Sequence, residues 1–473
     1  MKEKIKTILV IAAILCVGQT HGQDARGIQP EKGRYAIDST LQLIVWSPGV
    51  EARNYIWRNR GDSILLNNAS FAMSANSKWL YNYKDSIKLV KTRLPLIQIH
   101  SQEPIVDEPK TLVRIQYTHN DTVLDLVAGI ELRGNSALRY PKKSYDLEFR
   151  NPKNTEESID VQLEDMREDD DWILNSIYNE PLRLRSRFSN ALWLQMRKNL
   201  EKLKAAAGID LRYAEVFLDN NYQGIYLISE QVDRKLLQLK KKNGDTVRGE
   251  LFKASSYQAG SRFTDAPPFN NAFPTWAGFE MKYPYEDYTA HYDDLSTFVR
   301  LVSIGSDEEF NKSVSNWLNI DNAIDYYLFV NLLRATDNLG KNYYLAREDV
   351  GRPYYFVPWD LDGILGTIQD GKRIPTTDDI LTNELFTRLW DNNPSNYRNK
   401  AVARWQELRK GPFSEDHLFS EIDHLYVDLS DAGVYEREQL VWNVTMDPQD
   451  DYEYLTSWLR ARLEFLDNYF TDD

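Results

Sequence analysis

Cysteine is almost absent from this chain of 473 residues, because its single cysteine, Cys16, lies near the amino terminus. Downstream of that position the chain cannot build a disulfide framework, a zinc site with cysteine ligands or an iron–sulfur cluster. Basic residues are not in excess either, since 57 Lys and Arg stand against 71 Asp and Glu and the formal charge is −14. A general nucleic-acid-binding surface needs a basic face, so no nucleic-acid partner is expected.

Long apolar runs are also missing. The longest, residues 8–17, spans about ten residues, whereas a membrane-spanning helix needs roughly 20. Three lysines in residues 2–6 precede the run, and small residues at positions 20 and 22 follow it, which predicts a secretory signal over residues 1–22 and cleavage before Gln23. The mature chain is therefore expected to be exported, to the periplasm or outside the cell, without a transmembrane span.

Several catalytic motifs are absent as well. The sequence contains no G-x-x-x-x-G-K-[ST], G-x-G-x-x-G, G-x-S-x-G or H-E-x-x-H, so P-loop, Rossmann, serine-hydrolase and zincin sites have no support. His417 and His424 are seven positions apart on a predicted helix, and the acidic residues around them favour a solvated face over a metal site.

The pattern divides the remaining chain into three regions. Residues 23–90 form an unassigned extension. Residues 91–232 read as short strands with one helix over 181–200 and a hairpin turn at 219–224. The predicted strands cover residues 94–99, 111–117, 124–132, 144–149, 214–218 and 225–228. Residues 233–473 read as mainly helical, with amphipathic helices from residue 383 onwards.

The helical region contains one β-hairpin, predicted from residues 343–346 and 354–357. A helix that Asp321 can cap precedes it, and a polar loop over residues 336–341 joins the two. The hairpin leads into the sequence Trp359-Asp360-Leu361-Asp362.

Three polar residues surround this hairpin. Asp337 and Asn342 are five positions apart before it, and Asp360 follows its exit. Phosphoryl transfer needs a carboxylate that accepts a hydroxyl proton and oxygen ligands that hold magnesium, and protein kinases place these groups in this order and spacing. The alternative is that Asp337 belongs to an ordinary helix-ending loop and Asp360 to a turn.

Candidate phosphate and adenine contacts lie earlier in the chain. Lys143 is predicted to share a strand face with apolar neighbours and to contact phosphate, or else to extend its ammonium group to solvent at a sheet edge. The turn before it offers the backbone N–H of Ser136 and the side chain of Arg139. Backbone groups of Glu230 and Val232, at the end of a predicted strand, would meet an adenine edge.

Taken in order, these segments resemble the CotH kinase family, an atypical branch of the protein-kinase-like fold. The resemblance covers roughly residues 94–470. It rests on Leu94-Pro95-Leu96-Ile97, Leu132-Arg133-Gly134-Asn135-Ser136, Pro141-Lys142-Lys143-Ser144-Tyr145, Asp171-Trp172-Ile173-Leu174, Tyr178, Arg185, Gly224-Ile225-Tyr226-Leu227-Ile228-Ser229-Glu230, Asp337 with Asn342-Tyr343-Tyr344, Trp359-Asp360-Leu361-Asp362 and Gly366. It implies an α+β, bilobal, kinase-like fold with a β-rich N-lobe over residues 91–232 and a helical C-lobe over residues 233–473.

The resemblance further implies a secreted protein serine kinase that uses ATP and Mg²⁺ or Mn²⁺ and acts on a secreted or cell-surface protein. Asp337 is then the catalytic residue, Asp360 the metal ligand and Lys143 the phosphate contact, and kinase spacing adds Asn342 as a second ligand. One departure is that the helix over 181–200 holds no acidic residue to pair with Lys143. The alternatives are a non-catalytic envelope or surface-assembly protein and, with less support, a glycosyltransferase that uses Asp360 and Asp362 as a D-x-D metal clamp.

Overall fold

The computed structural model describes residues 34–471 apart from residues 48–54, 60–61, 67–71, 74–79, 83–86, 135–136, 198–207 and 286–288. The chain forms two compact units. Unit 1 comprises residues 1–176, 212–228 and 427–446, and unit 2 comprises residues 177–211, 229–426 and 447–473. The predicted signal segment over residues 1–22 lies outside the described residues.

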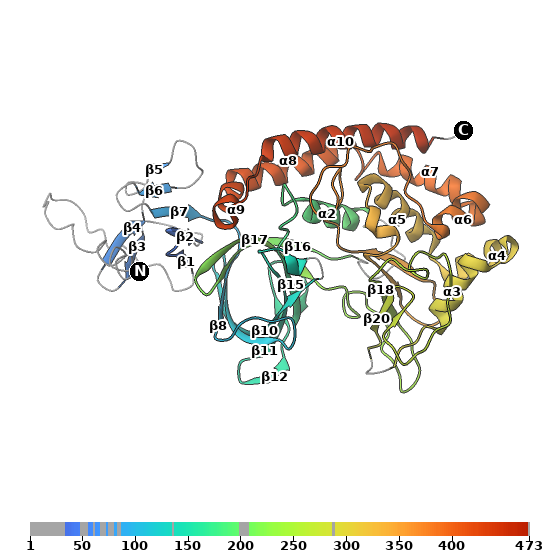
Figure 1. The fold of residues 1–473 in the computed structure, drawn as a ribbon, viewed down its shortest axis with the longest axis horizontal. Helices are drawn as coiled ribbons and strands as arrows, with labels where there is room; N and C mark the ends of the chain where they lie inside the picture. Colours follow the sequence, from blue (N-terminus) through green and yellow to red (C-terminus); the bar gives the residue numbers. More distant parts are fainter. Residues whose placement is uncertain are drawn as a thin grey trace, which may run out of the picture. The chain divides into compact units, whose positions relative to one another are not determined.

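A closed barrel of seven strands dominates unit 1 (Figure 1). Its order is β10-β9-β8-β16-β17-β15-β11, and a direct β10–β11 pairing closes the ring. The strands are β8 (Leu96–Ser101), β9 (Thr111–His119), β10 (Thr122–Arg133), β11 (Ser144–Asn151), β15 (Asp171–Asn175), β16 (Leu211–Leu218) and β17 (Asn221–Glu230). Six of them begin or end within a few residues of the predicted strands, and only β15 was not predicted.

Apolar side chains at alternating positions of the strands fill the interior of the barrel. Tyr145, Leu147 and Phe149 of β11 are buried in the same apolar cluster as Trp172 of β15 and Val216 of β16. Successive side chains of a strand point to opposite faces, so this period-two pattern places one face of each strand in the interior. Strand β12 (Asn154–Ser158) pairs with β11, and β13 (Val161–Gln162) and β14 (Glu168–Asp169) form a separate two-stranded sheet.

The region that the sequence left unassigned contains a second sheet, of order β1-β2-β7-β6-β5. Its strands are β1 (Tyr35–Asp38), β2 (Leu43–Trp46), β5 (Ala72–Met73), β6 (Leu80–Asn82) and β7 (Ile87–Lys91), and β3 (Tyr55–Asn59) and β4 (Asp62–Leu66) form a separate hairpin. Leu43, Val45 and Val90 share a small apolar core with Leu96 and Phe217 of the barrel strands. The sheet therefore packs on the outside of the barrel within unit 1.

The described residues contain nine α-helices, most of them in unit 2. They are α2 (Arg185–Arg197), α3 (Asp293–Ile304), α4 (Asp307–Trp317), α5 (Ile320–Leu333), α6 (Glu384–Asn392), α7 (Tyr397–Leu408), α8 (Glu415–Asp431), α9 (Val434–Trp442) and α10 (Pro448–Tyr469). Helix α9 belongs to unit 1. On α8, His417 contacts Gln195 with 2.6 Å between Nε2 and Oε1, and His424 is exposed. Together with the barrel, these helices confirm the mixed α+β class.

Helix α5 is the buried centre of unit 2, since nearly every one of its residues is shielded from solvent. The prediction that Asp321 caps it was wrong. Asn319 is the cap, because its side chain accepts a hydrogen bond of 3.0 Å from the backbone N–H of Asn322, and Asp321 lies in the first turn. Asparagine and aspartate cap helices about equally well, so the pattern alone did not separate the two positions.

A five-stranded sheet of order β19-β20-β18-β21-β22 accompanies these helices in unit 2. Its strands are β18 (Glu250–Ala254), β19 (Thr275–Trp276), β20 (Phe279–Tyr283), β21 (Tyr343–Arg347) and β22 (Tyr355–Pro358). Strands β21 and β22 form the predicted hairpin, in which Tyr343 is opposite Pro358.

No α-helix in the described part of the chain combines the length and the apolar character that a membrane crossing requires.

Candidate functional site

Asp337 lies in a short 3-10 helix, η2 (Thr336–Leu339), directly after α5. The residue is 9% exposed, and both carboxylate oxygens have partners. The Tyr257 hydroxyl donates to Oδ1 over 2.7 Å, and Lys341 Nζ lies 2.8 Å from Oδ2. The carboxylate therefore has a fixed orientation, next to one hydroxyl and one cation.

Asn338, the residue after Asp337, connects this loop to the exit of the hairpin. Its Nδ2 donates to the carbonyl of Asn342 over 2.6 Å and to the carbonyl of Trp359 over 2.8 Å. The N–H of Trp359 in turn donates to the Asn342 carbonyl over 3.1 Å. Since Trp359 directly precedes Asp360, the structure brings Asn342 and the start of the Asp360 segment together at the open end of the hairpin.

Asn342 and Asp360 share an unusual backbone conformation. Their φ angles are +58° and +56°, in the left-handed region that most non-glycine residues avoid. Asn and Asp visit this region more readily than other residues, because a short polar side chain bonds locally. The turns on both sides of the hairpin therefore favour the residue types that the sequence places there.

Asp360 and Asp362 form a pair of neighbouring carboxylates. Asp360 is exposed, and burial followed by the negative charge of Asp360 raises the pKa of Asp362 well above its usual range. The side-chain amide of Asn179 opposes this rise by donating to Asp362 Oδ2 over 2.7 Å. Neighbouring carboxylates that are both ionised repel each other, and a divalent cation bound between them would relieve the repulsion.

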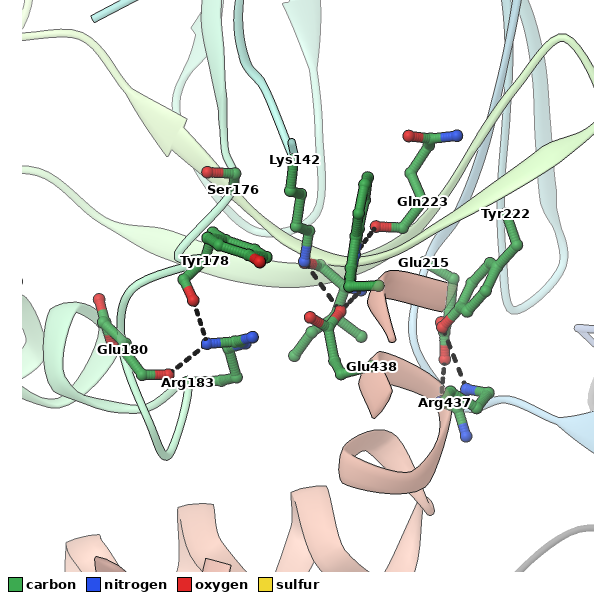
Figure 2. Close-up of polar contacts among 12 residues, drawn as sticks. Lys142, Ser176, Tyr178, Glu180, Arg183, Glu215, Tyr222, Gln223, Arg437 and Glu438 are labelled. Carbon is green, nitrogen blue, oxygen red and sulfur yellow. Dashed lines mark hydrogen bonds and ion pairs between the residues drawn. The ribbon is translucent and has the colours of Figure 1, made fainter. Parts of the chain in front are cut away.

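The segment before α2 packs against the chain that follows Asp362. Arg185 is buried and donates from Nε to the carbonyl of Ile364 over 3.0 Å. Buried Glu180 accepts from the N–H of Ser186 at the start of α2, at 3.3 Å to each oxygen, and burial raises its pKa. The Arg183 guanidinium bonds backbone carbonyls of the same segment (Figure 2). Glu180 thus caps α2, and Arg185 supports the Asp362 loop.

Lys143 lies in unit 1, immediately before β11. It is half-buried, and its Nζ donates over 2.6 Å to each of the carbonyls of Leu138 and Tyr140. These carbonyls belong to or follow the short 3-10 helix η1 (Ala137–Arg139), which ends at Arg139. Ser136 lies outside the described residues. The contacts tie Lys143 to the turn that the sequence analysis proposed for phosphate, and its role stays a prediction.

The sequence analysis left open which acidic residue pairs with Lys143, and in the structure it is the neighbouring lysine, Lys142, that has a buried acidic partner. Its side chain is fully buried and pairs with Glu438 of α9 over 2.8 Å, and its Nζ also donates to the carbonyl of Ile225 over 2.6 Å (Figure 2). Glu438 accepts from the Ile225 N–H over 2.9 Å, and the Tyr226 ring lies 4.8 Å from the ammonium group. This pair anchors the segment that carries Lys143 to β17.

Glu230 ends β17, where adenine contacts were predicted. Its N–H donates to the carbonyl of Asp210 over 3.3 Å, and its carboxylate accepts from the Asp210 N–H over 2.8 Å. The Glu230 carbonyl accepts from the Ser229 hydroxyl over 2.9 Å. Val232 is buried at 7% exposure. An adenine contact at these backbone groups stays a prediction.

Sequence reasoning missed several residues of this site. Asn338 and Lys341 are close to Asp337 in the sequence, so a search of the neighbouring positions could have found them. Tyr257 is 80 positions from Asp337, and Asn179 is 183 positions from Asp362. No local pattern connects such distant partners, because the fold alone brings them together.

Comparison with known proteins identifies the class. The family model described as CotH kinase protein matches residues 130–466, and the chain therefore belongs to this family. A curated relative, the inner spore coat protein H of Bacillus subtilis (strain 168), is 23% identical over 299 residues, which cover 63% of this chain and 75% of that protein. The residues that the family model matches include Lys143, the Asp337 loop and Asp360.

Proposed function

We propose that the chain is an exported protein serine kinase of the CotH type, with a bilobal, kinase-like fold, that uses ATP and a divalent metal. The observation that carries the proposal is the loop of Asp337 and Asn342, which Asn338 joins to the residue before Asp360. Membership of the CotH kinase family supports it independently. In this proposal Asp337 orients the serine hydroxyl of a secreted or cell-surface protein and accepts its proton.

The metal assignment is supported by the chemistry of the donor set. Mg²⁺ and Mn²⁺ prefer oxygen ligands, and Asp360, Asp362 and Asn342 offer carboxylate and amide oxygens at one end of the hairpin. The raised pKa of Asp362 reflects in part the charge of Asp360, the kind of repulsion that a bound cation removes. When bound, such an ion neutralises charge on the nucleotide phosphates. Asp360 is proposed as its principal ligand and Asn342 as the second.

The nucleotide assignment rests on the resemblance and on residue types. Lys143, with Arg139 and Ser136 in the preceding turn, is proposed to contact the phosphates, and backbone groups of Glu230 and Val232 the adenine. The contacts of Lys143 with backbone carbonyls hold a cation in the turn, and a phosphate would compete for the same ammonium group.

A second candidate is a non-catalytic surface-assembly protein that keeps the scaffold for nucleotide or partner binding. The printed name of the relative, an inner spore coat protein, favours it. It predicts binding without phosphate transfer.

Phosphate transfer separates the two candidates. The chain beginning at Gln23 is incubated with labelled ATP, synthetic serine peptides and Mg²⁺ or Mn²⁺, and products are mapped by mass spectrometry. The kinase proposal predicts metal-dependent label on serine, in the peptides or in the chain itself. Asp265→Asn, a change at an exposed aspartate of the same unit, serves as a control that keeps transfer. Binding of ATP with no transfer under any of these conditions would favour the second candidate.

A further inference from the structure

Tyr257 occupies one side of the Asp337 carboxylate. Its hydroxyl donates to Oδ1 over 2.7 Å and also lies 3.2 Å from the carbonyl of Thr336. Burial and the hydrogen bond with Asp337 raise the pKa of Tyr257, so the hydroxyl keeps the proton that it donates. A neutral O–H that donates to the catalytic carboxylate is the contact that an acceptor hydroxyl needs before phosphate transfer.

The ring of Tyr257 packs against residue 340, where only a glycine leaves room for it. A Cβ at Gly340 would be 2.3 Å from Cδ1 and 2.4 Å from Cε1 of this ring, closer than atoms can approach. Lys341 Nζ, which pairs with Asp337 Oδ2, lies 5.5 Å from the centroid of the Tyr257 ring. Despite these contacts Tyr257 is 49% exposed, unlike the core aromatics of unit 2.

The segment that carries Tyr257 is held on both sides of it. The Ser261 hydroxyl donates to the carbonyl of Ser256 over 2.7 Å and accepts from the N–H of Gln258 over 3.1 Å, and the Tyr343 hydroxyl donates to the Ser261 carbonyl over 2.5 Å. These bonds fix the backbone. The Tyr257 side chain is held by its hydroxyl and by the surface of Gly340, so it can leave Asp337 while the segment stays in place.

We propose that Tyr257 is a gate: its hydroxyl occupies the acceptor position at Asp337 in the free enzyme, and an incoming hydroxyl must displace it. Both oxygens of Asp337 have partners, and Tyr257 is the neutral one, so an acceptor replaces it without separating the Asp337–Lys341 charges. The inference rests on the proposed kinase function. It adds a way in which the site suppresses hydrolysis of ATP when no acceptor is bound.

Hydrolysis of ATP without any acceptor tests the gate, and the probe is ATP with Mg²⁺ or Mn²⁺ alone. In that reaction a water oxygen bonds to the γ-phosphorus, the bond to the β,γ-bridging oxygen breaks, and the water proton passes to Asp337 and on to solvent. In Tyr257→Phe the ring remains but a water molecule takes the position of the hydroxyl. Phosphate release should rise about tenfold or more, the scale of one hydrogen bond to a charged group, with the KM for ATP unchanged.

Gly340→Ala provides an independent variant, because a methyl group there displaces the ring and leaves the chemistry of Tyr257 and Asp337 intact. It should raise hydrolysis in the same direction. Tyr285→Phe, at an exposed tyrosine of the same unit, is the matched control and should leave the rate unchanged.

Two other results are informative. Equal or slower hydrolysis in Tyr257→Phe and Gly340→Ala, with ATP bound as in the parent, would overturn the gate, and slower turnover would mean that Tyr257 positions Asp337 instead. Absence of metal-dependent ATP binding in the parent, measured by calorimetry, would be a separate outcome that removes the proposed kinase function and the gate with it.

Discussion

The buried pair Lys142–Glu438 gives a quantitative test of how unit 1 holds the segment that carries Lys143. Both side chains are fully shielded from solvent. In Glu438→Gln the amide oxygen can still accept from the N–H of Ile225, but the ammonium group of Lys142 loses its counter-charge. Removing one partner of a buried pair costs about 3–5 kcal/mol, because the remaining charge cannot be solvated.

The structure places this variant near the lower end of that range. The Ile225 carbonyl, 2.6 Å from Nζ, and the Tyr226 ring, 4.8 Å away, still stabilise the cation. A loss of about 3 kcal/mol is therefore expected, which is a large part of the 5–15 kcal/mol of a typical domain. Lys142→Met in the Glu438→Gln background should recover most of it, since no buried charge then remains.

Urea unfolding followed by tryptophan fluorescence measures the loss, and hydrogen exchange of peptides from β17 assigns it to unit 1. The control is Glu280→Gln, which breaks the partly exposed pair with Lys282, at 2.6 Å, and should change stability by about 0–1 kcal/mol. A loss below about 1 kcal/mol in Glu438→Gln, or no recovery in the double variant, would refute the reasoning that the pair is buried and charged.

Three further predictions concern the sites and the barrel. Lys143→Ala should weaken ATP binding roughly tenfold to a hundredfold in calorimetry while leaving the fold intact, because a charged phosphate contact is worth about 1.5–3 kcal/mol; equal affinity would move the phosphate site elsewhere. Asp360→Ala should abolish Mg²⁺-dependent ATP binding, and binding that keeps its metal dependence would contradict the ligand assignment. Burial and the charge of Asp170 raise the pKa of Asp171 from 3.8 to about 7, so the folded state holds this proton more tightly than the unfolded state and stability falls as pH rises from about 4 to 7. In Asp171→Asn the contribution of this residue to the loss of stability, at most about 4 kcal/mol at pH 8, should disappear. Urea midpoints that change with pH as they do in the parent would contradict this prediction.

Local patterns in the sequence predicted the hairpin of the site well. The strands predicted over residues 343–346 and 354–357, the polar loop before them and Asp360 after them are contiguous, and β21 and β22 pair as the predicted hairpin. Residues close in sequence constrain one another through backbone geometry, which the residue types reveal.

Contacts between residues far apart in the sequence could not be predicted, because local patterns constrain only residues that are close in sequence. Closure of the barrel depends on the parallel pairing of β16 with β8, in which Glu215 lies opposite Leu96, and the partner of Lys142 lies 296 positions away on α9. The period-two argument favoured Lys143, yet β11 begins only at Ser144, and Lys142 is the lysine with a buried acidic partner. No spacing in the sequence separates two adjacent lysines whose environments come from distant elements.

In the proposed mechanism Asp337 accepts the proton of the acceptor hydroxyl, whereas Asp360 holds the metal. The decisive measurement compares nucleotide affinity and phosphate transfer side by side for Asp337→Asn and the parent. Mg²⁺-dependent ATP binding should be nearly unchanged, and transfer should fall by roughly a hundredfold to ten-thousandfold, as for a missing general base. Transfer at the parent's rate in Asp337→Asn would contradict the assignment of the catalytic residue.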